Sequence, residues 1–556
     1  MIGRRKRHRD KELAPDEIFL DSSNLPSFDT TRLEGRLEKP VSERTFVGIT
    51  AVIALMLVGF VVQAGSLEIV QGEKFATQSE NNRLRPEVLF AKRGAILDRN
   101  GVVLVENTPS EAGFVERSYM APGFAHLLGY VSYPKKDSSG NYYETDIKGL
   151  AGVESAFDES LSGENGLFLI EEDALGELQS QGSVKAPVDG TPLTLSIDSR
   201  VQSAMYDAIK ELADRIPYKG GAGVVMDVET GEIIALTSYP EYDPNILSKG
   251  QPSSVIAGYN TDPREPYLDR PVNGLYTPGS IVKPVIAAGV FNDGIISPEK
   301  IIVSTGSISL PNPYDASNPS IFKDWKALGP MNMRSAIAYS SDVYFYTVGG
   351  GFGDQKGLGI NRLDYWYKAF GYTSRTGIEL AGESEGFIPT PAWKEETYGE
   401  PWRVGNTYHT AIGQYAVQIT PLEAVRSIAA IANGGTLVKA TVLTGQAPTG
   451  ETINVSQEGL RIVREGMRMG VTEGTSVGLN ALPYVQAAGK TGTAQLGVNN
   501  EQYNSWAVGF FPYDKPKYAY AVVMERAPAG TSVGGIYVMY QTLSKMREVA
   551  PEYFGL

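Results

Sequence analysis

The chain of 556 residues is long enough for about three or four folding units, and its 42% hydrophobic and 21% charged residues are typical of a globular protein. The formal net charge of −14 argues against nucleic acid as a partner, because phosphate binding needs a basic face. No cysteine is present, which excludes disulfides, thiolate metal sites, cysteine nucleophiles and a lipidated cysteine anchor. The histidines, which form no HExxH pattern, are His8, His126 and His409. The sequence therefore predicts no metal site and no cofactor, and it favours a base other than histidine if this is a serine enzyme.

One segment near the N-terminus is predicted to cross a membrane. Residues 45–67 form a run of 23 without a charged side chain, and a helix of that length spans a hydrocarbon layer of roughly 30 Å. A cleaved signal peptide is the rival interpretation, but the run is long for one and starts far from the N-terminus. The other alternative, a buried helix of a soluble domain, fits poorly with the length and the lack of charge.

The residues before this span, 1–44, are predicted to be a disordered cytoplasmic tail, because they mix charge with Pro and Ser. Basic residues ahead of a span stay inside the cell, so the remainder of the chain is expected outside. Near the start these are Arg4, Arg5, Lys6, Arg7, Arg9 and Lys11.

Beyond the span the pattern predicts a small β-rich module over 68–190 and a larger domain over 191–556. In the module, 95–105 reads as a strand, a tight Asn-Gly turn and a second strand. In the larger domain a strand and an amphipathic helix come first, further strands follow early and late, and a helix ends the chain. Strands at both ends with helices between them predict an α+β domain with a central antiparallel sheet flanked by helices. The segments are 194–197, 199–213, 223–228, 232–237, 505–511, 518–524 and 537–549.

Serine followed three residues later by lysine is a candidate nucleophile and base, because on a helix both side chains lie on one face. A neutral amine is needed, and burial with a second cation nearby would favour it. Only Ser280, paired with Lys283, follows a Pro-Gly turn and leads an apolar helix; a plain helix-capping serine is the alternative. The other pairs are Ser297/Lys300, predicted to cap a helix, and Ser132/Lys135 and Ser320/Lys323 in polar loops.

Two further motifs strengthen the case for Ser280. One KTG occurs in the chain, and on a strand edge its cation and hydroxyls can hold a carboxylate while a backbone N–H serves an oxyanion. The second is Ser340-Ser-Asp342, a corner that can project a hydroxyl and a carboxylate into a cleft. Each alone also fits a turn or a helix cap. The KTG residues, with the next threonine, are Lys490, Thr491, Gly492 and Thr493.

In the order S-x-x-K, S-x-[ND], KTG these motifs are the signature of penicillin-binding proteins and serine β-lactamases. The chain resembles class B penicillin-binding proteins, most closely the elongation-type, penicillin-binding protein 2-like transpeptidases. Residues 93–101, 149–154 and 161–163 are similar to the family's non-catalytic motifs, and no glycosyltransferase domain fits before the catalytic one. Further landmarks are 324–326, 411–414, 420–421, 432–435 and 506–510.

The resemblance implies an activity, peptidoglycan D,D-transpeptidation in the bacterial cytoplasmic membrane, and a role for each motif. Ser280 would attack a D-Ala-D-Ala carbonyl of a stem peptide, or a β-lactam, with Lys283 as base. Ser340 would relay a proton to the leaving amine. The KTG motif and Thr493 would hold the substrate carboxylate, and the N–H groups of Ser280 and Thr493 would form the oxyanion hole.

Two departures from the family pattern leave alternatives open. Asp342 stands where many members have Asn, and its charge favours a protonated Lys283, against the base role. The module over 68–190 is short, so the part through which such enzymes are thought to engage a RodA/FtsW-type membrane glycosyltransferase is expected to be reduced. A β-lactam sensor or hydrolase of the same fold is one rival. A catalytically inactive wall-assembly scaffold is the other, although the intact motifs argue against it.

Overall fold

The computed structural model describes residues 43–76, 84–111, 113–120, 122–172, 178–312, 315 and 317–555. The predicted basic tail therefore lies outside the described residues, apart from its last two positions. The chain divides into two compact units. One comprises Met1–Arg85 with Glu171–Ser180, and the other comprises Pro86–Ile170 with Gln181–Leu556.

The first unit contains the predicted membrane span. Helix α1 (Glu43–Gly65) continues as a π-helical segment over Ser66–Val70, and together they are long and apolar enough to cross a membrane. None of the side chains of α1 is buried. An exposed helix that is apolar on all sides matches a lipid environment better than water.

The second unit begins with a β-rich region, here called the pedestal (residues 86–170 and 181–195). Its four-stranded sheet has the order β11-β2-β3-β4, and the predicted Asn-Gly hairpin joins β2 to β3 with Gly101 at φ 82°. Strands β5 to β8 are only two or three residues long. Its elements, of which β1, β9 and β10 also include a few residues of the first unit, are β1 (Leu84–Leu89), β2 (Ile96–Leu97), β3 (Val103–Thr108), β4 (Glu116–Tyr119), α3 (Ala125–Leu128), β5 (Val131–Ser132), β6 (Lys135–Lys136), β7 (Tyr142–Glu144), β8 (Lys148–Gly149), α4 (Gly152–Ala156), α5 (Asp158–Ser162), β9 (Gly166–Glu172), β10 (Leu178–Lys185) and β11 (Leu193–Thr194).

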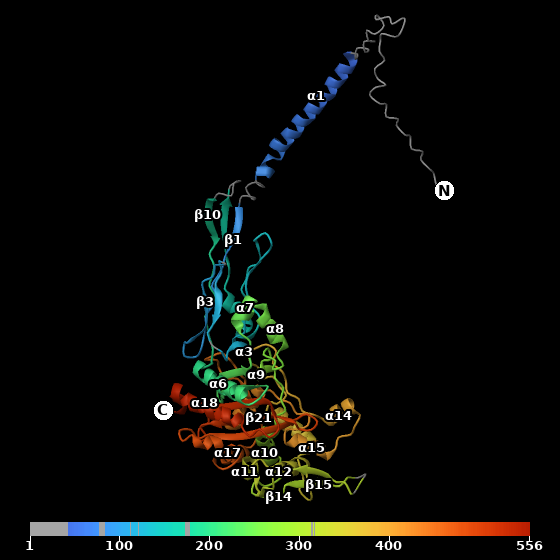
Figure 1. The fold of residues 1–556 in the computed structure, drawn as a ribbon, viewed down its shortest axis with the longest axis vertical. Helices are drawn as coiled ribbons and strands as arrows, with labels where there is room; N and C mark the ends of the chain where they lie inside the picture. Colours follow the sequence, from blue (N-terminus) through green and yellow to red (C-terminus); the bar gives the residue numbers. More distant parts are fainter. Residues whose placement is uncertain are drawn as a thin grey trace, which may run out of the picture. The chain divides into compact units, whose positions relative to one another are not determined.

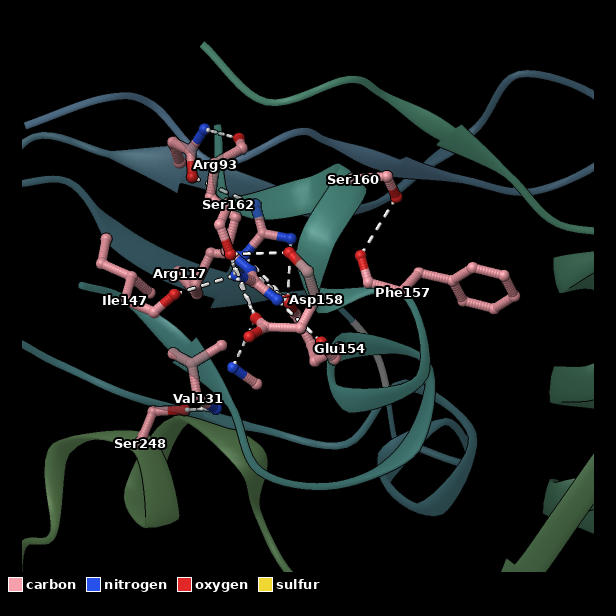
Figure 2. Close-up of polar contacts among 12 residues, drawn as sticks. Arg93, Arg117, Val131, Ile147, Glu154, Phe157, Asp158, Ser160, Ser162 and Ser248 are labelled. Atoms are coloured by element: carbon pink, nitrogen blue, oxygen red, sulfur yellow. Dashed lines mark hydrogen bonds and ion pairs between the residues drawn. The ribbon is translucent and has the colours of Figure 1, made fainter. Parts of the chain in front are cut away.

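A buried ion network joins the pedestal segments 93–101, 149–154 and 161–163, which resemble the family's non-catalytic motifs. Arg93 Nε lies 2.6 Å from Glu154 Oε2, and Arg117 Nη2 lies 2.7 Å from Glu154 Oε1, with all three side chains fully buried. Arg93 also pairs with Asp158 at 2.7 Å and donates to Ser162 Oγ. Figure 2 shows both guanidinium groups turned toward these carboxylates. The motifs, far apart in sequence, therefore meet in one charge cluster.

The centre of the larger domain is a five-stranded antiparallel sheet with the order β13-β12-β22-β21-β20. Side chains alternate between its faces as the two-residue period of a strand requires. In β22, Tyr520, Val522 and Met524 enter one hydrophobic core, whereas Ala519, Ala521 and Val523 enter the other. The predicted α+β fold with a central antiparallel sheet is confirmed.

Helices cover both faces of this sheet. Helices α6 and α18 pack on one face, and α10, α11, α16 and α17 lie on the other (Figure 1). The elements are α6 (Ser199–Arg215), β12 (Gly220–Asp227), β13 (Ile233–Tyr239), α7 (Pro244–Lys249), α8 (Ser253–Thr261), α9 (Arg270–Asn273), α10 (Lys283–Asn292), β14 (Ile302–Ser304), β15 (Ser307–Leu310), β16 (Ser320–Lys323), β17 (Gly329–Met331), α11 (Met333–Ala338), α12 (Asp342–Gly350), α13 (Ile360–Ala369), α14 (Pro391–Tyr398), α15 (Val404–Ala411), α16 (Pro421–Ala432), β18 (Thr436–Val438), β19 (Gly450–Thr452), α17 (Gln457–Thr472), β20 (Ala488–Leu496), β21 (Gln502–Phe511), β22 (Tyr518–Pro528) and α18 (Gly535–Val549).

The pedestal and the larger domain share polar contacts through the segment after β13. Ser248 Oγ of α7 accepts from Val131 N at 3.2 Å, and Lys249 pairs with Glu116 at 2.8 Å. Glu241 accepts from Ala125 N at the start of α3 at 3.0 Å. Helix α7 therefore packs against the pedestal, although it follows the larger domain's first strands in the sequence.

Candidate active site

The candidate nucleophile, Ser280, lies in a 3₁₀ turn (Gly279–Val282) that leads directly into α10. This turn packs closely against strand β20: a Cβ on Gly279 would lie 2.7 Å from Thr493 O, and one on Gly492 would lie 2.7 Å from Pro278 O. Gly279 also has φ 59°, which an L side chain rarely adopts. The glycines therefore allow the serine turn to sit directly on the KTG strand, and Ser280 stays partly exposed.

Lys283 is the first residue of α10, and its side chain is completely buried. Its Nζ donates to Asp342 Oδ1 at 2.6 Å, to Ser340 O at 2.8 Å and to Ser340 Oγ at 3.2 Å. All three hydrogen bonds of this amine are therefore made to Ser340 and Asp342 of the second motif. No hydrogen bond joins this amine to Ser280 Oγ within the described residues, and such contacts commonly tighten only when substrate binds.

The second motif forms the predicted corner between two helices. Helix α11 ends at Ala338, Ser340 has φ 60°, and Ser341 caps α12 by accepting from Tyr344 N at 3.2 Å. A positive φ is uncommon for a residue other than glycine, and such conformations concentrate at functional sites. The corner projects the side chains of Ser340 and Asp342 toward the same lysine amine.

The KTG motif lies on β20, an edge strand of the central sheet. Gln414 Nε2 donates to Thr493 O at 3.4 Å from outside the sheet. In an antiparallel strand the N–H and C=O of one residue point to the same side, so the N–H of Thr493 also faces this open edge. It therefore faces the side on which Ser280 lies, as an oxyanion donor requires. Thr491 Oγ1 bonds to Thr475 Oγ1 at 2.7 Å.

Lys490 is a buried cation without a carboxylate partner among the described residues. Its side chain is 1% exposed, and its Nζ donates to Thr491 O at 2.8 Å. Burial lowers the pKa of Lys490 well below its usual value; Lys283 adds to this effect and Asp342 opposes it. Two lysines thus share one carboxylate, and an incoming anion would complete the balance of charge.

The remaining serine-lysine pairs lie away from this arrangement. Ser297 begins a turn closed by Lys300 N to Ser297 O at 3.0 Å, so the prediction that it caps a helix is wrong. Ser320 and Lys323 lie in strand β16, not in a loop as predicted, and an i, i+3 pair in a strand points to opposite faces. Ser132 ends strand β5 in the pedestal. Ser280 and Lys283 alone among the four pairs meet the other two motifs.

His126 and His409 lie in different parts of the structure. His126 is buried in α3 with Nε2 3.0 Å from Pro266 O, and burial lowers its pKa to about 3. His409, on α15, is close enough to the second motif for Asp342 to affect it. Burial lowers the pKa of His409, and Asp342 opposes this shift. Within the described residues no group of acidic or histidine side chains could hold a metal ion.

Two contributors to the site were not identified as site residues from the sequence. Thr475, whose hydroxyl meets Thr491, lies in a loop after α17 with no recognisable motif. Asp324 was recognised only as part of a family landmark, but its carboxylate accepts four hydrogen bonds beside the second motif. Only the folded arrangement reveals these contacts, because the partners are distant in sequence.

Comparisons with known proteins agree with this geometry. Residues 221–541 match the model of the penicillin-binding protein transpeptidase domain, and residues 114–195 match that of the penicillin-binding protein dimerisation domain. The chain is 30% identical to the peptidoglycan D,D-transpeptidase MrdA of Acinetobacter baumannii, over 88% of this chain and 85% of that protein.

Two solved structures are similar over most of the chain. One is PBP2 of Pseudomonas aeruginosa in complex with WCK 5153, with a TM-score of 0.68, 29% identity and coverage of 83% of this chain and 96% of that one. The other is PBP2 of Helicobacter pylori in complex with MreC, with a TM-score of 0.70, 25% identity and coverage of 84% and 100%.

Proposed function

Because the chain belongs to the penicillin-binding protein family with a transpeptidase domain, we propose that it is a peptidoglycan D,D-transpeptidase that cross-links stem peptides in cell elongation. The relatives named MrdA support this activity. One structural observation carries the proposal: Lys283, buried beneath the Ser280 turn, bonds to both Ser340 and Asp342 beside the KTG strand. The first two motifs meet at this amine, and the serine turn packs directly on the KTG strand, so the three motifs lie together as acyl transfer through a serine requires.

In the first half-reaction, Ser280 Oγ attacks the carbonyl carbon between the two terminal D-Ala residues of a donor stem peptide. Lys283 takes the hydroxyl proton, and the N–H groups of Ser280 and Thr493 stabilise the oxyanion. The C–N bond then breaks, and Ser340 passes a proton to the leaving D-Ala. An ester joins the shortened peptide to Ser280.

In the second half-reaction, an amine of another stem peptide attacks this ester. The ester C–O bond breaks, a peptide bond forms, and Ser280 recovers its proton. A β-lactam enters the first step in the same way, but its leaving group stays attached after ring opening, so the acyl-enzyme persists. Asp342 Oδ1 lies 2.6 Å from Lys283 Nζ, and we propose that it holds this amine in place beside Ser340 during both half-reactions.

We propose that Lys490, Thr491, Gly492 and Thr493 bind the terminal carboxylate of the donor peptide. The buried amine of Lys490, which has no carboxylate partner among the residues that the structure describes, supports this. Its position on an open strand edge lets a peptide lie alongside β20. The same carboxylate is present in penicillins, which explains how a β-lactam would be recognised.

For location, we propose a single-pass protein of the bacterial cytoplasmic membrane, with the N-terminus inside and the catalytic domain outside. The exposed apolar helix α1 supports one crossing. We further propose a RodA/FtsW-type membrane glycosyltransferase as partner. A solved structure with a TM-score of 0.71 and 25% identity, which shows the coordination of polymerization and crosslinking by a peptidoglycan synthase complex, supports this. A reporter fused after Leu556 should be active only if it works outside the cytoplasm; activity inside would refute the orientation.

Labelled penicillin tests the proposed chemistry. The full-length protein in detergent should take up one stable label, and mass spectrometry of a digest should place it on the peptide that contains Ser280. Rapid release of the label would instead indicate a β-lactam hydrolase, and absence of label would indicate an inactive scaffold. A label on Ser132, Ser297 or Ser320 would refute the choice of nucleophile.

A further inference from the structure

The carboxylate of Asp324 links three separate segments around the Ser340–Asp342 corner. Its Oδ2 accepts from Ser341 Oγ at 2.8 Å, Ser304 Oγ at 2.9 Å and Val343 N at 3.1 Å. Its Oδ1 accepts from Trp325 N at 2.9 Å. The residue is 8% exposed, so these bonds form in an environment where a carboxylate must be fully hydrogen-bonded.

This carboxylate also lies at the N-terminus of α12. Val343 is the second residue of that helix, and Ser341 is its cap. Unpaired N–H groups and the helix dipole both favour a negative charge there. Asp324 thus extends the cap: Ser341 Oγ accepts from Tyr344 N and donates to Asp324 at the same time.

The contacts alternate along the corner. The segment that contains Asp324 holds the odd-numbered positions: Trp325 Nε1 donates to Tyr339 O at 3.1 Å, and Asp324 binds positions 341 and 343. The even-numbered side chains, Ser340 and Asp342, both contact the amine of Lys283. One set of contacts anchors the corner, and the other set carries the chemistry.

We propose that Asp324 is a positioning residue for acyl transfer, which fixes the corner so that Ser340 and Asp342 reach Lys283. This inference rests on the proposed function of the site. Ser340 is held at φ 60°, a conformation that persists only where the surroundings enforce it. Displacement of reacting groups by about 1 Å can cost on the order of 10²-fold in rate. Asp324 itself touches neither Ser280 nor Lys283 among the contacts that the structure describes.

Two serine variants make a matched test, because both hydroxyls donate to the same oxygen of Asp324. Ser341→Ala removes the bond to the corner, whereas Ser304→Ala removes the bond to β14. Acylation by a fluorescent penicillin is resolved into the non-covalent constant K and the acylation rate k2. We expect Ser341→Ala to lower k2 by about 10- to 100-fold with K nearly unchanged, because the carboxylate-binding KTG strand is not touched. Ser304→Ala should lower k2 by less than about threefold.

Asp324→Asn extends the test to the carboxylate. An amide has one oxygen, so it cannot accept hydrogen bonds at both positions. We therefore expect Asp324→Asn to lower k2 at least as much as Ser341→Ala. The double variant, Asp324→Asn with Ser341→Ala, should be little worse than either single variant. Equal losses of k2 in the two serine variants, or losses in K alone, would overturn the positioning role. Thermal unfolding of each variant checks folding. If the wild-type protein is not acylated, the proposed function fails instead, so the two failures are distinguishable.

Discussion

The pedestal and the catalytic site both bury charged side chains, but they balance the charges differently. In the pedestal, two arginines face two carboxylates, Glu154 and Asp158, and Arg93 makes further bonds to Ile147 O, Ser162 Oγ and Glu154 O. Each of these charges has an opposite partner. Such a network orders distant segments and needs nothing from outside the protein.

In the candidate active site, Asp342 is the one carboxylate that acts on both Lys283 and Lys490 within the part of the chain that the structure describes. Lys490 is as buried as the pedestal arginines, but among the described residues its amine donates only to a backbone carbonyl. A buried cation without a counter-ion is costly, and sites of this kind are retained where a ligand supplies the missing charge. The comparison teaches that completeness of pairing, and not burial, distinguishes the charge cluster of the pedestal from that of the candidate active site.

The largest expected effect comes from Lys283→Arg, which keeps the charge but removes the ability to lose a proton. We expect acylation by penicillin to fall by roughly 10²–10⁴-fold, the usual contribution of a general base. Stopped-flow measurement with a fluorescent penicillin checks this. Lys300→Arg, in one of the unused serine-lysine pairs, is the control and should behave as wild type. Near-normal acylation of a folded Lys283→Arg protein would mean that the lysine serves only as a fixed cation.

The second effect concerns the pedestal. Glu154→Gln keeps the shape but leaves two fully buried arginines with one charge partner fewer, so we expect the free energy of unfolding to fall by about 3–5 kcal/mol. Glu164→Gln is the control, because its pair with Lys185 is exposed. Chemical denaturation of the full chain in detergent measures both. Equal, small losses in the two variants would show that the pedestal network does not need its charge balance.

Many of the residues in the pedestal cluster and in the candidate active site can be predicted from sequence, but which charged side chains pair with each other cannot. The motifs around Ser280, Ser340 and Lys490 were predicted from sequence, and the structure brings them together, although their roles remain predictions. The alternation in β22 and the hairpins follow from a local two-residue period, which sequence reveals well.

The contacts that sequence could not predict join segments far apart in the chain. Arg93 and Glu154 belong to recognised motifs, but nothing in either motif names the other as its partner. The same is true of Asp324 with Ser304 and Ser341, which only tertiary packing brings together. A helix-capping serine was expected at position 297 because Pro follows it. The chain instead makes a turn there, and no helix follows.

The third expected effect is that a substitution of Lys490 raises stability and lowers activity. Lys490→Met replaces a buried unpaired cation by an apolar side chain of similar length, so we expect the free-energy of unfolding to rise by about 1–3 kcal/mol. The gain should be largest below the lowered pKa of Lys490, where the wild-type side chain is charged. Penicillin acylation should be nearly lost. Lys515→Met, at an exposed turn of the same sheet, is the control and should change neither quantity. A destabilised Lys490→Met protein would contradict the view that this charge is uncompensated.

The smallest effect is a pH dependence of substrate binding that follows from the same lysine. Burial, reinforced by Lys283, lowers the pKa of Lys490 well below its usual value. A bound carboxylate favours the protonated amine, so affinity is complete below the lowered pKa and weakens as pH rises through it.

The change is at most about tenfold per pH unit, the limit for loss of one proton. We therefore expect the constant K for penicillin to begin to increase at a pH below the one at which an ordinary lysine titrates, because the pKa of Lys490 is lowered. A penicillin whose carboxylate is esterified lacks the negative charge that would interact with Lys490, so its K should not show this increase with pH. Identical pH profiles for the acid and the ester would show that Lys490 does not bind the carboxylate as a cation.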